Sequence, residues 1–359
     1  MTLLGQSVFL LLGKVVLCYN LGCPVHQKRM DNFVLPFNKI AKKDVKIAGG
    51  KGASLGEMTK AKLPVPPGFV VLASTFDKFL ADTPPPIGRG QDLNVYIEAE
   101  LKKVNHQNVS SIDRASQVIQ DMIHDAEMPK VIETAILSEY KKLSAKGGSA
   151  FGRKWVAVRS SATAEDSSVA SWAGELDTFL FIDEKKLVET VKKCWASLFT
   201  PRAIFYRFEK KLHKTSVSVA VVVQQMINSE ISGVAFSVHP VSRDKNQLII
   251  EAGYGLGEAI VSGAITPDSY VVHKKEGTIL DINISKQEKQ IIMKPGGGSI
   301  LKPVAKSIRE KQKLTGKQII ELSEIIKKIE KHYGCPQDIE WAVYRGKFYI
   351  LQSRPITTL

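Results

Sequence analysis

The spacing of apolar residues changes partway along this chain, and this change constrains the fold more than any other feature. Between Ala115 and Ala126 apolar residues recur at helical intervals, and a second helical stretch follows Pro129 and ends near Gly147. From Ser216 onward the chain consists mainly of short apolar runs typical of strands. Helices and strands therefore concentrate in different parts of the chain, which predicts the α+β class.

The pattern divides the chain into two halves. Strands are expected at 155–159 and 178–182, followed by a helix at about 184–199. We expect an N-terminal lobe at 30–215 and a C-terminal lobe at 216–359, with the boundary near residue 215.

Residues 1–29 do not share this patterning. Ser7–Cys18 is an apolar run of the length of a signal-peptide core, but Lys14 interrupts it and it is too short to span a bilayer. Globular patterning starts directly after Met30. We therefore expect either that Met30 is the physiological start or that 1–29 is a poorly ordered extension, and we expect no membrane partner.

The composition indicates a globular chain, with 44% hydrophobic and 24% charged residues. The formal charge of +14 attracts polyanions, but the sequence has no Arg-rich tract and no basic run interleaved with aromatic residues. Solvated lysines and a site for a small polyanion explain the charge better than nucleic acid does. The four cysteines are scattered without zinc-ligand spacing, which favours a reducing, cytoplasmic setting.

Two segments of the N-terminal half have the residue types that bind anions. The loop Gly49–Gly52 allows backbone N–H groups to approach an anion and runs into a helix, and Lys51 adds a positive charge. A structural tight turn explains these glycines equally well. Arg159 ends an apolar strand, where a guanidinium is costly unless it meets an anion, and the small residues after it are suited to a flap over phosphates.

Two segments of the strand-rich half are suited to a nucleotide. The apolar strand ending at Gln224 and Gln225 can lie along an adenine ring with an amide at the ring's edge, although an ordinary core strand explains its valines. The loop Glu251–Glu258 lacks the spacing of the dinucleotide fingerprint. We expect it to be a strand-end loop near the nucleotide, with a purely structural turn as the alternative.

The last hairpin gathers an acid, an amide and a guanidinium. Alternation in the strands places Glu340, Gln352 and Arg354 on one face if a three-residue loop or a bulge occurs at Tyr344–Gly346. A carboxylate and an amide oxygen facing a phosphate make a suitable Mg²⁺ site, and the arginine can neutralise charge on a transferred phosphoryl group. The alternative is an exposed hairpin with unrelated polar residues.

The segments form a far more specific pattern in combination than singly. In chain order they read GGKGASLGEM, PVPPGFVV, VAVRSSATAEDS…AGELDTFL, VVVQQMI, SGVAFSV, YGLGEAIVSG…PDSYVV and DIEWA…LQSRP. Over residues 33–359 the chain resembles the N-terminal ATP-binding domain of phosphoenolpyruvate synthase and pyruvate phosphate dikinase, which the rifampicin phosphotransferases share. The resemblance implies an ATP-grasp fold, in which two lobes clamp the nucleotide.

The resemblance also implies cofactors and residue roles. The cofactors are ATP and Mg²⁺. By position, the implied roles are phosphate binding by Lys51 and Arg159, a flap containing Gly174 and Thr178, an adenine contact by Gln224, Mg²⁺ binding by Glu340 and Gln352, and contact with the transferred phosphates by Arg354. Arg354, Arg159 and Lys51 are the expected catalytic residues.

Family members couple this domain to a swivelling domain with a phosphate-accepting histidine and then to a pyruvate-binding domain. No histidine of this sequence has the family's Thr-Ser-His context. We therefore expect an ATP-dependent phosphotransferase with paired acceptors, pyruvate and water, which is incomplete without these domains in trans. The alternatives are the ATP-binding half of a rifampicin-type phosphotransferase, a non-catalytic nucleotide-binding module, and a decayed fragment that folds but binds nothing.

Overall fold

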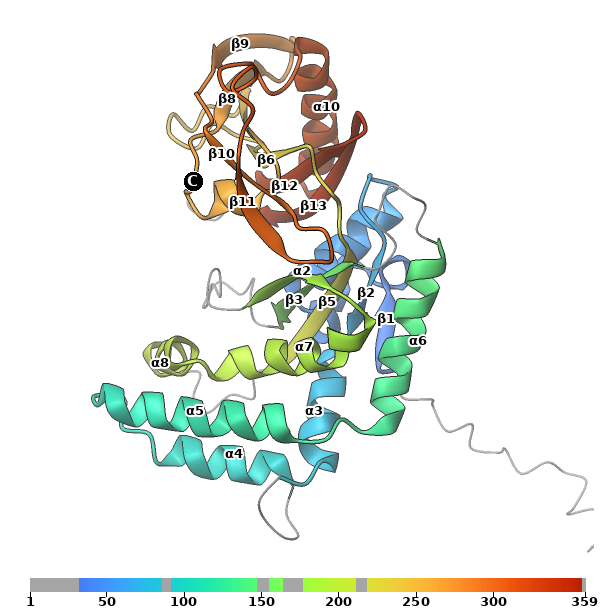
Figure 1. Cartoon of the computed structure of the whole chain (residues 1–359), viewed down its shortest axis with the longest axis vertical. Helices are drawn as coiled ribbons and strands as arrows, with labels where there is room; N and C mark the ends of the chain where they lie inside the picture. Colours follow the sequence, from blue (N-terminus) through green and yellow to red (C-terminus); the bar gives the residue numbers. More distant parts are fainter. Residues whose placement is uncertain (1–31, 86–91, 147–154, 164–176, 211–217, 357–359) are drawn as a thin grey trace, which may run out of the picture. The chain divides into compact units, whose positions relative to one another are not determined.

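The chain contains separate β-sheets covered by helices. The computed structural model describes residues 32–85, 92–146, 155–163, 177–210 and 218–356. Phe33–Leu359 form one compact unit, and its described strands make a five-stranded, a six-stranded and a two-stranded sheet (Figure 1). This mixture confirms the α+β class. The extension at 1–29 lies outside the described part of the chain.

The five-stranded sheet has the order β1-β2-β5-β3-β4, with antiparallel neighbours throughout. Its strands are β1 (Val34–Pro36), β2 (Gly68–Val71), β3 (Val156–Ala162), β4 (Thr178–Ile182) and β5 (Val219–Gln225). The helices of this part are α2 (Val45–Lys60), α3 (Ala73–Asp82), α4 (Leu93–Lys102), α5 (Val109–Asp125), α6 (Lys130–Lys146), α7 (Glu184–Ala196) and α8 (Pro201–Glu209).

One hydrophobic core lies between this sheet and the helices on one of its faces. Trp195 of α7 is fully buried there, with its ring 5.5 Å from the ring of Phe76 and 4.9 Å from that of Phe79. Val219, Val221 and Val223 of β5 belong to this core, and the intervening Ala220 and Val222 belong to a second core with α2. Both faces of β5 are therefore buried, which explains its uninterrupted apolar run.

The six-stranded sheet has the order β13-β12-β6-β7-β8-β9. Its strands are β6 (Ile231–Phe236), β7 (Gln247–Tyr254), β8 (Asp268–His273), β9 (Thr278–Asn283), β12 (Gln337–Tyr344) and β13 (Lys347–Pro355). The short helix α9 (Glu258–Val261) follows β7, and β10 (Lys289–Met293) pairs only with β11 (Ser299–Pro303) among the described strands.

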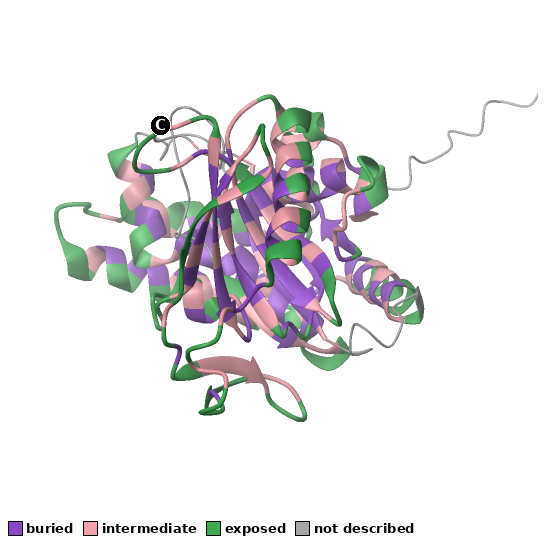
Figure 2. Cartoon of the chain, turned by 90° about the horizontal axis from the view of Figure 1, so that it is seen from above, coloured by how far each residue is buried: buried purple, intermediate pink, exposed green. Residues whose placement is uncertain are grey.

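Helix α10 (Gly316–Tyr333) covers one face of the six-stranded sheet. Thr315 and Gln318 form a capping box at its start, and Gly334 ends it in the left-handed conformation, with φ at 72°. The helix buries the stripe Ile319, Leu322, Ile326 and Ile329, which recur at helical spacing in the sequence. Figure 2 shows the buried residues of this unit along the strands and on the inner sides of the helices.

The two large sheets do not divide the chain at the expected boundary. β5 follows residue 215, yet it pairs with β2 and β3 of the first sheet. The chain passes to the six-stranded sheet only between Gln225 and Ile231. The apolar pattern predicted a strand here, but its partners come from distant segments and leave no local signal.

In the described residues, no helix combines the length and apolar character that a membrane crossing requires.

Candidate functional site

The glycine loop is a kink inside α2. Gly49 has φ of 68° and ψ of 171°, so the helix breaks there and restarts at Gly50. A Cβ at Gly49 would lie 2.2 Å from the backbone oxygen of Ser161 in β3, which only glycine avoids. The Ser161 hydroxyl donates to the Ala48 carbonyl and accepts from Gly52 N–H, at 3.0 and 3.2 Å. The positive end of the restarted helix therefore lies beside β3.

One face of the first sheet presents three of the expected site residues. Arg159 is paired with Thr178 of β4, and Ala157, two residues earlier in β3, is paired with Gln224 of β5. Paired residues of antiparallel strands project to the same side, and residues two apart along a strand do so too. Arg159, Thr178 and Gln224 therefore share the face on which Ser161 contacts α2.

Arg159 reaches from the first sheet to the last hairpin. Its Nη1 donates to the Leu351 carbonyl of β13 at 3.4 Å and lies 3.8 Å from Oε2 of Glu340 in β12. The Arg159 side chain is only 11% exposed, so its charge is held in a largely buried position. The expected anion-binding arginine and the expected metal-binding carboxylate are thus neighbours, although they come from different sheets.

The hairpin has the expected pairing but reaches it by another route. Its turn consists of two residues, Arg345 and Gly346, both with positive φ, and the bulge lies between Glu340 and Trp341 on the β12 side. The predicted loop or bulge at Tyr344–Gly346 was therefore wrong. A two-residue turn matches the twist of the strands, and the bulge restores the register in which Glu340 faces Gln352.

Asp338 is a site residue that the sequence reasoning missed. It pairs with Arg354 across the hairpin, and its Oδ2 accepts from Arg354 Nη2 at 2.7 Å and Nε at 2.9 Å. Two bonds from one guanidinium fix its orientation. Strand alternation already placed Asp338 on the face of Glu340, so this partner was within reach of the sequence.

A second missed acid, Glu251, lies in the same row of the sheet. Glu340 pairs with Val234 of β6, and Val234 pairs with Glu251 of β7. The three side chains therefore project to one side. Burial, and secondarily the charge of Asp338, raise the pKa of Glu251. The sequence signal for Glu251 was an acidic residue inside the apolar run of β7. Its position in the same row as Glu340 could not be predicted, because that position depends on the strand order.

Some buried polar atoms of this face have no hydrogen-bond partner in the described structure. They include Arg159 Nε and Gln224 Nε2. Because leaving a buried donor unpaired costs about 1–3 kcal/mol, such atoms indicate a place for an acceptor. Both belong to residues that the sequence assigned to phosphate and base binding.

The remaining expected residues are placed less fully. Lys51 is half-buried in the first turn after the kink of α2. Gly174 lies outside the described residues, as does most of the expected flap. The Gly255 carbonyl of the YGLG loop accepts from the hydroxyls of Ser229 and Ser232, at 3.0 and 2.6 Å, so this part of the loop has a structural role.

The donor set fits a magnesium ion better than a transition metal. Glu340 and Gln352 are paired and both partly exposed, and they offer carboxylate and amide oxygens. The described residues hold no group of three or more His, Cys, Asp and Glu placed to bind a metal together. Mg²⁺ suits such a site, because it usually takes one or two carboxylates and completes its coordination with water and phosphate oxygens.

Comparisons with known proteins give one family. The model of the pyruvate phosphate dikinase AMP/ATP-binding domain matches residues 45–359. A probable phosphoenolpyruvate synthase of Methanothermobacter thermautotrophicus is 44% identical over 333 residues, which are 92% of this chain and 47% of that protein. The phosphoenolpyruvate synthase of Pyrococcus furiosus is 41% identical over 362 residues, covering 91% of this chain and 44% of that protein.

The rifampicin phosphotransferase of Bacillus cereus is 38% identical over 334 residues, which are 92% of this chain and 36% of that protein. The chain thus spans less than half the length of each of these curated relatives. The family match covers all the described site residues and both large sheets except β1. This chain belongs to the family of the pyruvate phosphate dikinase AMP/ATP-binding domain.

Proposed function

We propose that this chain is the ATP-binding half of an enzyme of the phosphoenolpyruvate synthase type. The proposed fold is an ATP-grasp with two lobes, one built on the five-stranded sheet and one on the six-stranded sheet. The observation that carries the proposal is the position of Arg159, which extends from the first sheet to Leu351 and Glu340 of the second. A triphosphate with its metal would bind beside such groups, because they offer a fixed cation next to oxygen ligands.

The proposed roles follow the position of each residue. Lys51 and Arg159 hold phosphates, with the helix restarted after Gly49 supplying backbone N–H groups. Gln224 contacts adenine, which gives its unpaired Nε2 an acceptor. Gly174 and Thr178 belong to a flap against the phosphates. Arg354 contacts the phosphates that are transferred.

Glu340 and Gln352 would hold Mg²⁺. The ion would neutralise charge on the phosphate oxygens during transfer. The ion pair with Asp338 keeps Arg354 beside these ligands, and Nη1 of Arg159 lies 3.8 Å from Oε2 of Glu340.

The proposed reaction needs domains beyond those in this chain. ATP would transfer phosphoryl groups to a histidine on a swivelling domain, and a pyruvate-binding domain would then form phosphoenolpyruvate from pyruvate. The other products of ATP and water would be AMP and phosphate. Relatives more than twice as long as the matched part support the view that further domains act with this one. We propose a cytoplasmic setting, which suits the free thiols of Cys194 and Cys335.

A second candidate is the ATP-binding half of an antibiotic phosphotransferase. The rifampicin phosphotransferase of Bacillus cereus matches as much of this chain as the synthases do. The ATP site serves both reactions, so the acceptor distinguishes them. The test is to let ATP phosphorylate a histidine-bearing domain supplied in trans and then to add either pyruvate or rifampicin. The phosphorylated product that forms identifies the acceptor.

Thermal unfolding with and without Mg-ATP tests the nucleotide site. A ligand that binds only the native state stabilises it by about 2.7 kcal/mol at one hundred times its Kd. We expect Mg-ATP to raise the unfolding temperature of the natural chain and to raise that of Glu340→Ala much less. Glu276→Ala is the matched control, because this exposed carboxylate lies on the turn between β8 and β9.

Two results would count against the proposal. One is a folded natural chain that Mg-ATP does not stabilise at any concentration. The other is an equal shift in all three chains, which would mean that ATP binds without Glu340. A shift that is lost in EDTA and in Glu340→Ala but kept in Glu276→Ala supports the nucleotide and metal site together.

A further inference from the structure

Residues 284–314, which we name the arm, form a unit beside the six-stranded sheet. The arm contains β10 and β11, which pair with each other in an antiparallel ladder from Lys289 and Pro303 to Met293 and Ser299. Its two ends join β9 and α10. None of the residues proposed above to bind ATP or Mg²⁺ belongs to the arm.

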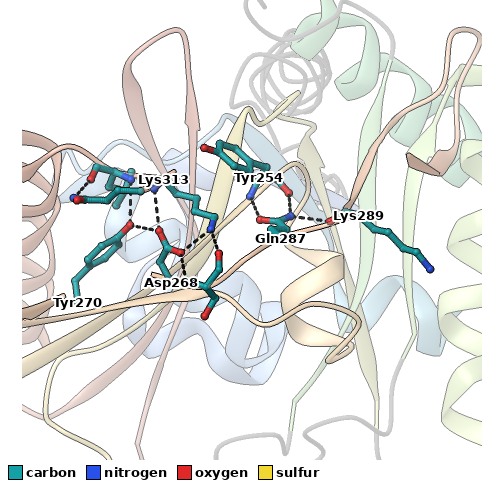
Figure 3. Close-up of polar contacts among 9 residues, drawn as sticks. Tyr254, Asp268, Tyr270, Gln287, Lys289 and Lys313 are labelled. Atoms are coloured by element: carbon teal, nitrogen blue, oxygen red, sulfur yellow. Dashed lines mark hydrogen bonds and ion pairs between the residues drawn. The ribbon is translucent and has the colours of Figure 1, made fainter. Parts of the chain in front are cut away.

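A fully buried ion pair fixes the base of the arm. Lys313 Nζ lies 2.7 Å from Oδ1 of Asp268 in β8, and both side chains are 0% exposed. Asp268 also accepts from the backbone N–H groups of Ser285 and Lys313, each at 2.9 Å, and from the Tyr270 hydroxyl at 2.8 Å. Both ends of the arm are thus bound to one carboxylate (Figure 3).

Gln287 fixes the arm at a second point. Its Oε1 accepts from Tyr254 N–H at 2.8 Å, and its Nε2 donates to the carbonyls of Tyr254 and Lys289 at 3.0 and 2.9 Å (Figure 3). Beyond this point Leu256 N–H donates to the Ile291 carbonyl at 2.8 Å. Gly255 has φ of 89°, and a Cβ there would lie 2.3 Å from that carbonyl. Glycine in the YGLG loop is therefore what lets the arm approach.

The tip of the arm lies against the first sheet. Gly297 has φ of 104°, and a Cβ there would lie 2.3 Å from the ring of Trp155, just before β3. Trp155 accepts a hydrogen bond from Met226 N–H, directly after β5. The arm therefore joins the loop after β7 to the ends of β3 and β5.

A small apolar cluster lies under the arm. Ile291 and Met293 of the arm pack against it, as do Trp155 and Leu180, and its buried members are Ala157, Phe181, Met226 and Leu256. Ala157 is paired with Gln224, so the two side chains project to the same side. Gln224 is 2% exposed, and its Nε2 has no partner in the described structure.

An apolar cluster beside a buried, unpaired amide has the chemistry that recognises a purine base. The base's faces contact apolar side chains, and its edge accepts and donates hydrogen bonds. We propose that the arm is the second wall of the base-binding end of the nucleotide site, opposite β3 and β5. This inference rests on the proposed ATP site. Asp268, Lys313 and Gln287 act as positioning residues, and the contact between Gly297 and Trp155 holds the wall in place.

The proposal separates the two ends of the nucleotide. The proposed phosphate-binding residues Lys51 and Arg159 come from α2 and β3, and neither belongs to the arm. A displaced arm should therefore weaken the binding of the base and leave the binding of the phosphates unchanged. Mg-ATP and Mg-tripolyphosphate are probes that differ in this respect, because only ATP carries a base.

The test is the affinity of both probes for Gly297→Val and Gly298→Val, measured by calorimetry. Both glycines have positive φ in the same turn, but a Cβ at Gly298 meets nothing within 4 Å. Gly298→Val is therefore the control for backbone strain. We expect Gly297→Val to bind ATP about tenfold more weakly, which is a change of 1.4 kcal/mol, and tripolyphosphate within about twofold of the natural chain. Gly298→Val should resemble the natural chain with both probes.

A second variant removes the contact from the other side. Trp155→Ala keeps the arm's own sequence, and we expect the same selective loss of ATP affinity. If the natural chain binds ATP but these variants keep its ratio of ATP to tripolyphosphate affinity, the arm is not a wall of the base site. A natural chain that binds neither probe instead overturns the proposed function, and this inference with it.

Discussion

Replacing Lys313 by methionine should destabilise the fold far more than most lysine substitutions. Lys313 and Asp268 form an ion pair in which neither side chain is exposed. Methionine occupies a similar volume, so the substitution removes the charge and the hydrogen bonds without leaving a large cavity. Asp268 would remain as a buried carboxylate that only neutral donors contact, namely Tyr270 and two backbone N–H groups.

The expected cost follows from that uncompensated charge. Removing one partner of a buried ion pair costs about 3–5 kcal/mol, because the other charge stays out of water. A second substitution, Asp268→Asn, should restore part of this loss in the double variant. The amide carries no charge, and its one oxygen can still accept from one of the two backbone donors, Ser285 N–H or Lys313 N–H, which contact different oxygens of Asp268.

Urea unfolding followed by circular dichroism measures these differences. Lys142→Met is the matched control, since Lys142 is 62% exposed and pairs with Glu139 on the surface of α6. Exposed pairs contribute at most about 1 kcal/mol. If Lys313→Met costs no more than this control, or if the double variant is less stable than Lys313→Met, the buried charge is not what makes the pair important.

Two further predictions use other titratable groups. Burial raises the pKa of the Cys194 thiol to about 12, so iodoacetamide at pH 8 should modify Cys335 well before Cys194. Mass spectrometry of the native chain measures the two rates, and equal rates would contradict this prediction. Two contacts lower the pKa of Glu57 below its ordinary 4.5: first a hydrogen bond from Lys42 N–H, and then the interaction with His332. The contribution of Glu57 to stability is therefore present above pH 4.5 and disappears as the pH falls through the lowered pKa. Urea midpoints should therefore fall less steeply below pH 4.5 in Glu57→Gln than in the natural chain, and parallel curves would refute the linkage.

Local patterns predicted the elements whose burial is one-sided. Helix α10 shows its buried stripe in the sequence because every third or fourth residue meets the sheet. The last hairpin was found in the same way, together with the pairing of Glu340 and Gln352. Its bulge was misplaced, since alternation fixes which residues share a face but not where the extra residue lies.

The arm had no such pattern to find. All five residues of β11 are exposed, including Ile300 and Leu301, and the strand pairs only with β10 in the described structure. A strand without a buried face shows no alternation of apolar and polar residues. Its contacts are made by single residues, such as Gln287 and Gly297, whose partners are far away in the sequence.

Long-range pairing also decided what the candidate site contains. Arg159 was identified as an anion-binding residue from its own strand, but its approach to Glu340 requires both sheets. Glu251 entered the site only because β6 lies between β7 and β12. The resemblance to a known family supplied the residue roles that spacing could not, and those roles await the proposed tests.

The small residues after Arg159 divide into two groups with different physical roles. Ser160 is fully buried and donates to the Cys194 carbonyl at 3.2 Å, and Ser161 joins the two sides of the kink at Gly49. These serines tie β3 to α7 and to α2, so they cannot move freely with a flap. The part of the expected flap that remains therefore starts after Thr163, outside the described residues. Arg159 lies inside β3, before these anchored serines, and a phosphate bound there would meet a charge whose position is already fixed.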